Sequence, residues 1–165
     1  KKKFDLVSSI GVLHHTHECL KSLKVVIKKY LKQDGYLFLG LYHKYGRKPF
    51  LDYFNELKKN KVKEETIFEK FKNLRPGNDK INDKSWFRDQ VLHPYETQHS
   101  FEELNIFLKK NNLEIKSTSI NNFKKIDSIQ KIIKMEKKFE KISKNKIKKK
   151  IYFPGFFIIL AKKIQ

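Results

Sequence analysis

Two short apolar runs near the start of the chain, with one amphipathic segment between them, restrict the possible fold most strongly. The runs cover residues 4–10 and 36–42 and have the composition of buried strands. Between them, apolar residues recur at spacings of three and four, which predicts a helix that begins at Thr16 or His17. Asp34 and Gly35 are expected to end this helix with a left-handed cap. Two apolar strands joined by one helix are typical of a parallel sheet covered on both faces.

The middle of the chain is predicted to be helical. Apolar stripes run from Pro49 to Leu74, and residues 75–79, Arg-Pro-Gly-Asn-Asp, are expected to break the helix. A polar stretch with Trp86 follows, and residues 93–99 are too rich in His, Pro and Tyr for a regular element. We therefore predict a loop there.

The last third of the chain is predicted to contain two helices and two strands. Ser100 and Glu103 match a capping box, so a helix is expected to run to about residue 110. Residues 113–120 alternate like a strand, and residues 152–162 form a second apolar strand. The Lys-rich segment between these strands has apolar residues at helical spacing, which predicts one amphipathic helix.

The chain is strongly basic, with a formal net charge of +20 and 38 Lys and Arg residues. Nucleic acid is a possible partner for such a chain. However, Arg47, Arg75 and Arg88 are the only arginines, although phosphate recognition favours the bidentate guanidinium. An abundance of Lys on solvated faces explains the charge without a nucleic-acid surface. Basicity alone does not choose between the two interpretations.

The cysteine content and the apolar runs indicate a cytoplasmic protein without a membrane partner. Cys19 is the single cysteine, which excludes an intramolecular disulfide and suits a reducing compartment. The longest apolar run, Tyr152–Ala161, is about half as long as a membrane-spanning helix and contains Pro154 and Gly155. No signal peptide is visible in the sequence.

Two motifs in the first 41 residues resemble those of class I S-adenosylmethionine-dependent methyltransferases. Residues 4–16, Phe-Asp-Leu-Val-Ser-Ser-Ile-Gly-Val-Leu-His-His-Thr, resemble the fourth-strand motif of this family. Residues 31–39, Leu-Lys-Gln-Asp-Gly-Tyr-Leu-Phe-Leu, are similar to the next motif, with Gln33 and Asp34 in place of the usual Pro and Gly. Either motif alone is weak, but the two in series with one helix between them leave few rival families.

The resemblance implies an α/β fold, the C-terminal half of a Rossmann-like sheet with helical insertions. Strands four to seven are expected, with the seventh antiparallel and inserted between the fifth and sixth. Residues 1–48 are interpreted as the unit of the fourth and fifth strands, residues 49–99 as a helical insertion on the substrate side, and residues 100–165 as the last helices and strands. Together they would form a partial methyltransferase domain.

The resemblance also implies that the cofactor is S-adenosylmethionine and that much of its binding site lies outside this chain. The family's glycine-rich turn and its acidic ribose-binding residue are expected upstream of Lys1, and Gly11 alone cannot replace them. The strand at residues 4–10 would then expose an apolar edge. We expect the isolated chain to be aggregation-prone, inactive and unable to bind the cofactor.

Residues at the carboxyl end of the first strand are the candidates for cofactor contact and catalysis. In open parallel sheets ligands bind beyond this end, so the resemblance places Ser9, Ile10, Gly11 and Val12 against the cofactor. His14 and His15 follow directly as tentative catalytic residues, acting as a general base or as a hydrogen-bonding partner of the nucleophile. The alternative is a structural role at the start of the helix. No metal site is predicted, because this cluster lacks ligands from separated segments.

Candidate substrate-binding residues follow the second strand and occupy the predicted loop. The first group leaves the strand at the same sheet edge, and Arg47 in it is suited to an anionic substrate group. The loop group is the densest polar cluster after the sheet and is interpreted as a lid, or alternatively as the segment that shapes the next helix. The two groups are Tyr42, Tyr45 and Arg47, and His93, Tyr95, Glu96 and His99.

The sequence therefore predicts a methyltransferase fragment whose acceptor is a small molecule, a protein or RNA. Methyl transfer needs mainly alignment of nucleophile, methyl and sulfur, so no obligatory catalytic residue is expected. Two alternatives remain open, a basic nucleic-acid-binding module and a degenerate methyltransferase-like interaction domain. The first predicts steeply salt-dependent RNA binding without cofactor. A glycine-rich motif found upstream would count against the second.

Overall fold

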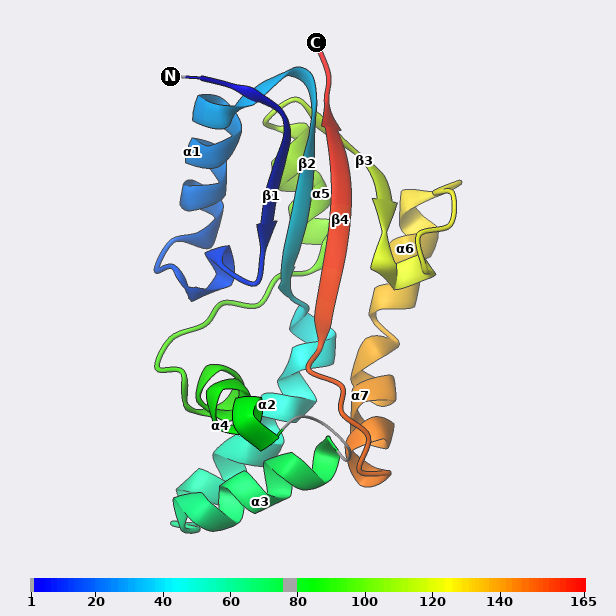
Figure 1. Ribbon diagram of the computed structural model, residues 1–165. Helices are drawn as coiled ribbons and strands as arrows, with labels where there is room; N and C mark the ends of the chain where they lie inside the picture. Colours follow the sequence, from blue (N-terminus) through cyan, green and yellow to red (C-terminus); the bar gives the residue numbers. More distant parts are fainter. Residues whose placement is uncertain (1, 76–79) are drawn as a thin grey trace.

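A four-stranded mixed sheet with the order β1-β2-β4-β3 organises the molecule (Figure 1). The computed structural model describes residues 2–75 and 80–165. β1 and β2 are parallel, whereas β4 runs antiparallel to both of its neighbours. This is the order expected for strands four, five, seven and six, so the predicted half-sheet is confirmed. The strands are β1 (Phe4–Ile10), β2 (Leu31–Tyr42), β3 (Leu113–Thr118) and β4 (Phe156–Lys163).

The helix between β1 and β2 is shorter than the sequence predicts. α1 spans Cys19–Tyr30, and β2 begins at once with Leu31, which is fully buried and pairs with Phe4. Asp34 has the positive φ of 60°, but it lies inside β2, where the register between the two strands shifts. The expected helix cap at Asp34 and Gly35 is therefore wrong. Burial of Leu31 in the sheet ends the helix earlier.

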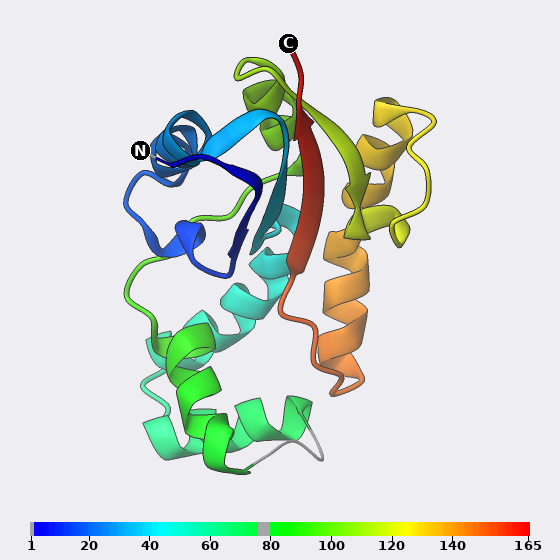
Figure 2. The same cartoon turned by 45° about the horizontal axis from the view of Figure 1, so that its top comes forward.

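One face of the sheet is covered by helices (Figure 2). Alternate β2 residues, Leu37, Leu39 and Leu41, are buried against α1 and α5 (Phe101–Lys109). Because side chains alternate along a strand, the neighbouring positions point to the other face. Leu6 is 59% exposed and Tyr36, its partner in β2, is 40% exposed. This second face, which includes Ile10, is apolar and exposed among the described residues. The prediction that β1 is a buried strand is therefore wrong.

A helical region lies beyond the carboxyl ends of β1 and β2 (Figure 1). Its own core contains Phe50, Phe54 and Phe71. α2 begins at Lys44, five residues before the predicted start, because the His43 side chain caps it. Residues 80–92, predicted to be a polar stretch, are helical, and of the predicted break at 75–79 residues 76–79 lie outside the described residues. The elements are α2 (Lys44–Lys59), α3 (Glu64–Leu74), α4 (Lys80–Phe87) and a π-helical turn (Arg88–Leu92).

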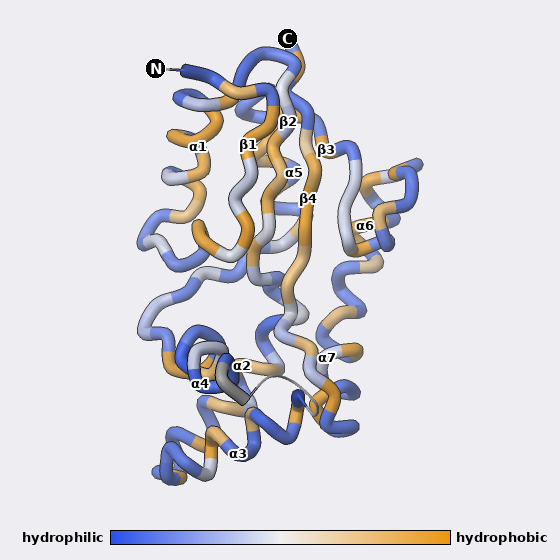
Figure 3. Tube along the Cα trace, in the orientation of Figure 1, coloured by the Kyte–Doolittle hydropathy of each residue, from blue (hydrophilic) through white to orange (hydrophobic). Residues whose placement is uncertain are grey.

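The helix predicted before the last strand is divided in two. α6 spans Ile129–Glu136 and α7 spans Phe139–Lys148, with a short break between them. β4 begins at Phe156, later than predicted, because the left-handed φ of 69° at Gly155 interrupts the extended backbone before it. Apolar colour follows β2 and β4 through the centre of the molecule (Figure 3). No helix in the described part of the chain is both long and apolar enough to cross a membrane.

Candidate functional site

A cavity of about 460 Å³ lies at the carboxyl ends of β1 and β2, next to the helical region. In parallel sheets this is the end where ligands bind. Its wall is formed by the ends of β1 and β2, the start of β4 and the segment from α4 to the π-helical turn. The lining residues are Ile10, Gly11, His14, Tyr42, Trp86, Asp89, Gln90, Tyr152, Pro154 and Phe156.

Two glycines shape the strand side of this cavity. Gly11 has a φ of 73°, and a Cβ atom added there would meet nothing within 4 Å, so the space above it is open. Its amide donates to the carbonyl of Gly40 at 3.1 Å. A Cβ atom at Gly40 would lie 2.6 Å from the Phe156 ring. Glycine at these positions therefore permits the turn after β1 and lets the Phe156 ring lie over β2.

His14 is held in the cavity wall as a neutral imidazole. It is only 1% exposed, and burial lowers its pKa to about 3, with the nearby His15 and Arg47 adding to the effect. Its carbonyl accepts from the backbone amide of Thr97 at 2.8 Å, and its Nδ1 has no hydrogen-bond partner among the described residues. The Tyr42 ring lies 4.1 Å away. So weak a base is suited to hydrogen bonding rather than to removing a proton.

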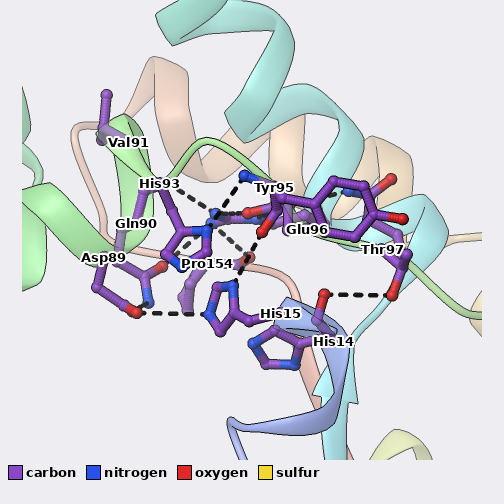
Figure 4. A network of polar contacts seen from close by, with 12 residues as sticks. His14, His15, Asp89, Gln90, Val91, His93, Tyr95, Glu96, Thr97 and Pro154 are labelled. Atoms are coloured by element: carbon purple, nitrogen blue, oxygen red, sulfur yellow. Dashed lines mark hydrogen bonds and ion pairs between the residues drawn. The ribbon is translucent and has the colours of Figure 1, made fainter. Parts of the chain in front are cut away.

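His15 faces the loop and the π-helical turn instead (Figure 4). Its Nδ1 lies 3.2 Å from the carbonyl of Tyr95, so Nδ1 carries the proton and donates it. Its Nε2 lies 3.4 Å from a carboxylate oxygen of Asp89. The His93 ring packs on the other side, with 3.9 Å between the ring centroids. His15 thus ties the loop to the end of β1.

Arg47, predicted to hold an anionic substrate group, is fully buried and fully engaged within the chain. Its Nε and one terminal nitrogen bind both oxygens of Glu96, at 3.0 and 2.6 Å. The remaining donors reach the side-chain oxygen and carbonyl of Gln90 and the carbonyl of Pro154. The guanidinium also lies 3.9 Å from the centroid of the Tyr42 ring. Because each of its five N–H donors has an acceptor, Arg47 offers none to the cavity.

The structure brings together only part of the predicted site. Ile10, Gly11, His14 and Tyr42 meet in the cavity wall. The other predicted residues lie outside the lining. Val12 is exposed, the ring of Tyr45 lies 5.8 Å from that of His43, and the Tyr95 hydroxyl donates to the carbonyl of His17. His99 bridges Glu103 and Thr97. The residues outside the lining are Ser9, Val12, His15, Tyr45, Arg47, His93, Tyr95, Glu96 and His99.

Sequence reasoning missed six lining residues, Trp86, Asp89, Gln90, Tyr152, Pro154 and Phe156. Trp86 is the single tryptophan and lies in a polar stretch, which is a usable signal for a binding surface. Tyr152 and Phe156 belong to an apolar run with the composition of a strand, so nothing in the pattern separates a cavity wall from a core. No group of three potential metal ligands occurs among residues 2–75 and 80–165.

The chain matches no family model and no curated protein. In structure it is similar to PKMT2 from Rickettsia typhi, with a TM-score of 0.64, 15% identity and coverage of 97% of this chain and 36% of that one. The structure of the same protein in complex with AdoHcy has a TM-score of 0.64 and 16% identity, and the match covers 97% of this chain and 35% of that one. For a SAM-dependent methyltransferase from Archaeoglobus fulgidus the TM-score is 0.43 and the identity 16%, with coverage of 98% of this chain and 60% of that one. The chain therefore has a class I methyltransferase fold and spans about a third of the length of PKMT2.

Proposed function

We propose that this chain is the C-terminal part of an S-adenosylmethionine-dependent methyltransferase and that its cavity is where the acceptor meets the methyl group. The observation that carries the proposal is the position of the cavity. It lies beyond β1 and β2, in a sheet with the strand order of this fold. A cytoplasmic location belongs to the same proposal.

The residues at the end of β1 fit the methionine end of the cofactor. The open space above Gly11 lets a ligand approach the backbone, and the buried Nδ1 atom of His14 has no hydrogen-bond partner among the described residues. Ser9, Ile10 and Val12 flank this position on the same strand end. When bound, the cofactor supplies an electrophilic methyl group on its sulfonium. The residues of this chain would exclude water from the reacting atoms and align the acceptor with the methyl group.

The open side of the sheet supports a larger domain. Within the described residues, β1 has a strand on only one side, and its edge carries unpaired backbone groups. Leu6, Ile10 and Tyr36 form an exposed apolar face on the side without helices. Sheets of this class are covered on both faces. We infer that further strands and helices of the full-length protein cover this edge and face and provide the rest of the cofactor site.

The helical region, residues 49–99, would shape the acceptor side. Arg47 and Glu96 do not face the cavity, so we assign them positioning roles that fix the loop at residues 93–99. His93 and Tyr95 extend this support by packing on His15 and bonding to His17, respectively. Tyr42 is the one predicted substrate residue in the cavity wall.

The test is titration of the full-length protein with S-adenosylhomocysteine in a calorimeter. Gly11→Val fills the open space, so we expect it to weaken binding at least about tenfold. Asn112→Val is the matched control, because Asn112 has a similar left-handed φ of 58° in the turn between α5 and β3, outside the cavity lining. We expect this variant to lose comparable stability and to keep its affinity.

Other outcomes would overturn the proposal. A folded full-length protein that binds no S-adenosylhomocysteine would be a degenerate methyltransferase-like domain that has the fold but not the activity. Tight RNA binding that weakens steeply with salt and does not respond to the cofactor would favour the nucleic-acid-binding module instead. Equal affinities of the Gly11→Val variant and the unmodified protein for S-adenosylhomocysteine would show that the cofactor does not bind next to Gly11.

A further inference from the structure

A second cleft, with a volume of about 400 Å³, lies at the β3 edge of the sheet. Its walls are formed by one face of α5, the middle of β3 and residues 125–129 at the start of α6. Figure 1 shows β3 and α6 side by side at this edge. The volume is in the range of small-molecule sites. The cleft shares no lining residue with the cavity beyond β1 and β2, so it is a separate candidate site.

The side chain of Asn105 lines this cleft without a hydrogen-bond partner among the described residues, although Asn105 is only 8% exposed. Asn111, after the end of the same helix, shows the usual alternative, because its amide donates to the carbonyl of Phe107, four residues earlier, at 2.8 Å. The amide of Asn105 makes no such bond to the carbonyl of Phe101. A buried amide without a partner destabilises a fold and is therefore rare. This side chain indicates that a ligand supplies the missing partner.

The start of α6 adds further donors to the cleft. Ser128 caps the helix, and its hydroxyl oxygen accepts from the amide of Lys131 at 3.4 Å. The first amides of a helix have no partner inside the helix, and partial positive charge gathers at this end. Ser128 and Ile129 both line the cleft, so the start of the helix borders it. Oxyanions bind at helix starts of this kind.

Lysines from three different segments surround the cleft. Lys109 belongs to α5, Lys116 to β3 and Lys125 to the segment before α6. Lys116 pairs with Glu114, whereas Lys109 and Lys125 form no ion pair with a described residue. Asp127 is the other acidic residue of the lining, and all five charged residues are exposed. Because the lysines outnumber the acids, the rim is positive and lies beside a wall of neutral donors.

We propose that this cleft binds the phosphate group of a small ligand. The donors are Asn105, the first amides of α6 and the lysines, and they come from different sides of the cleft. A tetrahedral phosphate has oxygens that point in several directions and can accept from all of them, whereas the two oxygens of a carboxylate lie in one plane. Lys109 and Lys125 can balance the two negative charges of a phosphate monoester. Phosphate binding here is independent of methyl transfer, because the two sites share no residue.

The test is a calorimetric titration of the full-length protein with three probes at constant ionic strength. Inorganic phosphate, at a pH where it is a dianion, represents a phosphate monoester. Dimethyl phosphate represents the diester of nucleic-acid backbones and lipids, and acetate represents a carboxylate. We expect inorganic phosphate to bind at least about tenfold more tightly than either of the other probes.

Two variants locate the bound phosphate. Asn105→Leu is expected to weaken phosphate binding about tenfold. Without phosphate this variant should unfold at the same or a higher temperature than the unmodified protein, because an unpaired buried amide is removed. Lys125→Ala, at an exposed position, should fold normally and bind phosphate about fivefold more weakly.

Two control variants lie just outside the cleft. Asn111→Leu removes the hydrogen bond to Phe107, so it should lower stability and leave the affinity for phosphate unchanged. Lys110→Ala removes an exposed charge next to Lys109 and should also leave this affinity unchanged. All four variants should bind S-adenosylhomocysteine as the unmodified protein does.

Several results would overturn phosphate binding in this cleft. One is the absence of saturable binding, and another is equal affinity for phosphate and acetate. Tighter binding of dimethyl phosphate would mean a nucleic-acid backbone or a lipid in place of a small phosphorylated ligand. Equal losses in Lys110→Ala and Lys125→Ala would mean diffuse attraction to a basic surface. An Asn105→Leu variant that loses stability and keeps its affinity would give Asn105 a structural role only.

Discussion

The imidazole Nε2 of His43 lies 2.9 Å from a carboxylate oxygen of Glu136, and both side chains are completely shielded from solvent. The other ring nitrogen of His43 accepts from the amide of Gly46, so Nε2 carries the proton and donates it to Glu136. The same carboxylate accepts from the amides of Phe101 and Glu102 at 2.7 and 3.3 Å. One buried pair thus connects the starts of α2 and α5 with the end of α6.

Glu136→Ala is expected to lower the free energy of unfolding by about 3 kcal/mol or more, since it leaves buried donors without an acceptor. Urea unfolding of the full-length protein measures this change. Glu140→Ala is the control, because Glu140 forms an exposed pair with Lys144 on α7 and should leave stability almost unchanged. Similar values for the two variants would contradict the structural role of Glu136.

Arg47 and Glu96 should show strong energetic coupling. A double-mutant cycle with Arg47→Ala and Glu96→Ala is expected to give a coupling of about 2–3 kcal/mol, because the pair is buried and two-pronged. Arg47→Lys should recover only a small part, since Lys cannot fill five acceptor positions. Lys48→Ala on the exposed side of α2 is the control. Coupling near zero would mean that the loop is held by other contacts.

His14 should make stability depend on pH. Its pKa falls from 6.5 to about 3 on folding, so below pH 6.5 the unfolded chain takes up a proton that the folded chain refuses. The stability present above pH 6.5 is lost as the pH falls toward 3, by up to about 1.4 kcal/mol per pH unit. When urea unfolding is measured at pH 7 and at pH 5, the free energy of unfolding of the His14→Phe variant should fall less between the two pH values than that of the unmodified protein. His17→Phe, at an exposed position, should behave like the unmodified protein.

The 165-residue chain by itself should self-associate and should not bind S-adenosylhomocysteine. The cause is the open face around Leu6 and Ile10 beside the unpaired edge of β1. Light scattering after size-exclusion chromatography measures the mass. Leu6→Lys should raise the monomer fraction, whereas Val25→Lys, at an exposed position on α1, should not. A monomeric chain with micromolar affinity for S-adenosylhomocysteine would refute this prediction.

The sheet was predictable because its determinants are local. Apolar runs define β1 and β2, and the amide of Glu103 donates to Ser100 as the capping-box pattern indicates. The carboxylate of Glu103 instead binds His99, which lies four residues earlier in the loop. A helix start is thus encoded in neighbouring residues, but a competing tertiary partner can redirect one half of the motif.

The site was only partly predictable because its contacts join distant segments. Arg47 and Glu96 were both assigned to the substrate, but they are 49 positions apart and bind each other. Residue type shows that each can bind an opposite charge, and only the fold shows which charge is near. Tyr152 is similar, because its place in the cavity depends on the turn at Gly155 that separates it from β4.

Gly155 has a consequence for engineering. A Cβ atom there would lie 2.2 Å from the backbone of Gly46 and Arg47, so the turn before β4 and the start of α2 fit together only without a side chain. Grafting residues 44–99 onto another scaffold of this fold would therefore require moving residues 153–156 with them. Residues 44–99 and the turn before β4 would have to be transferred together, although more than fifty residues separate them in the sequence.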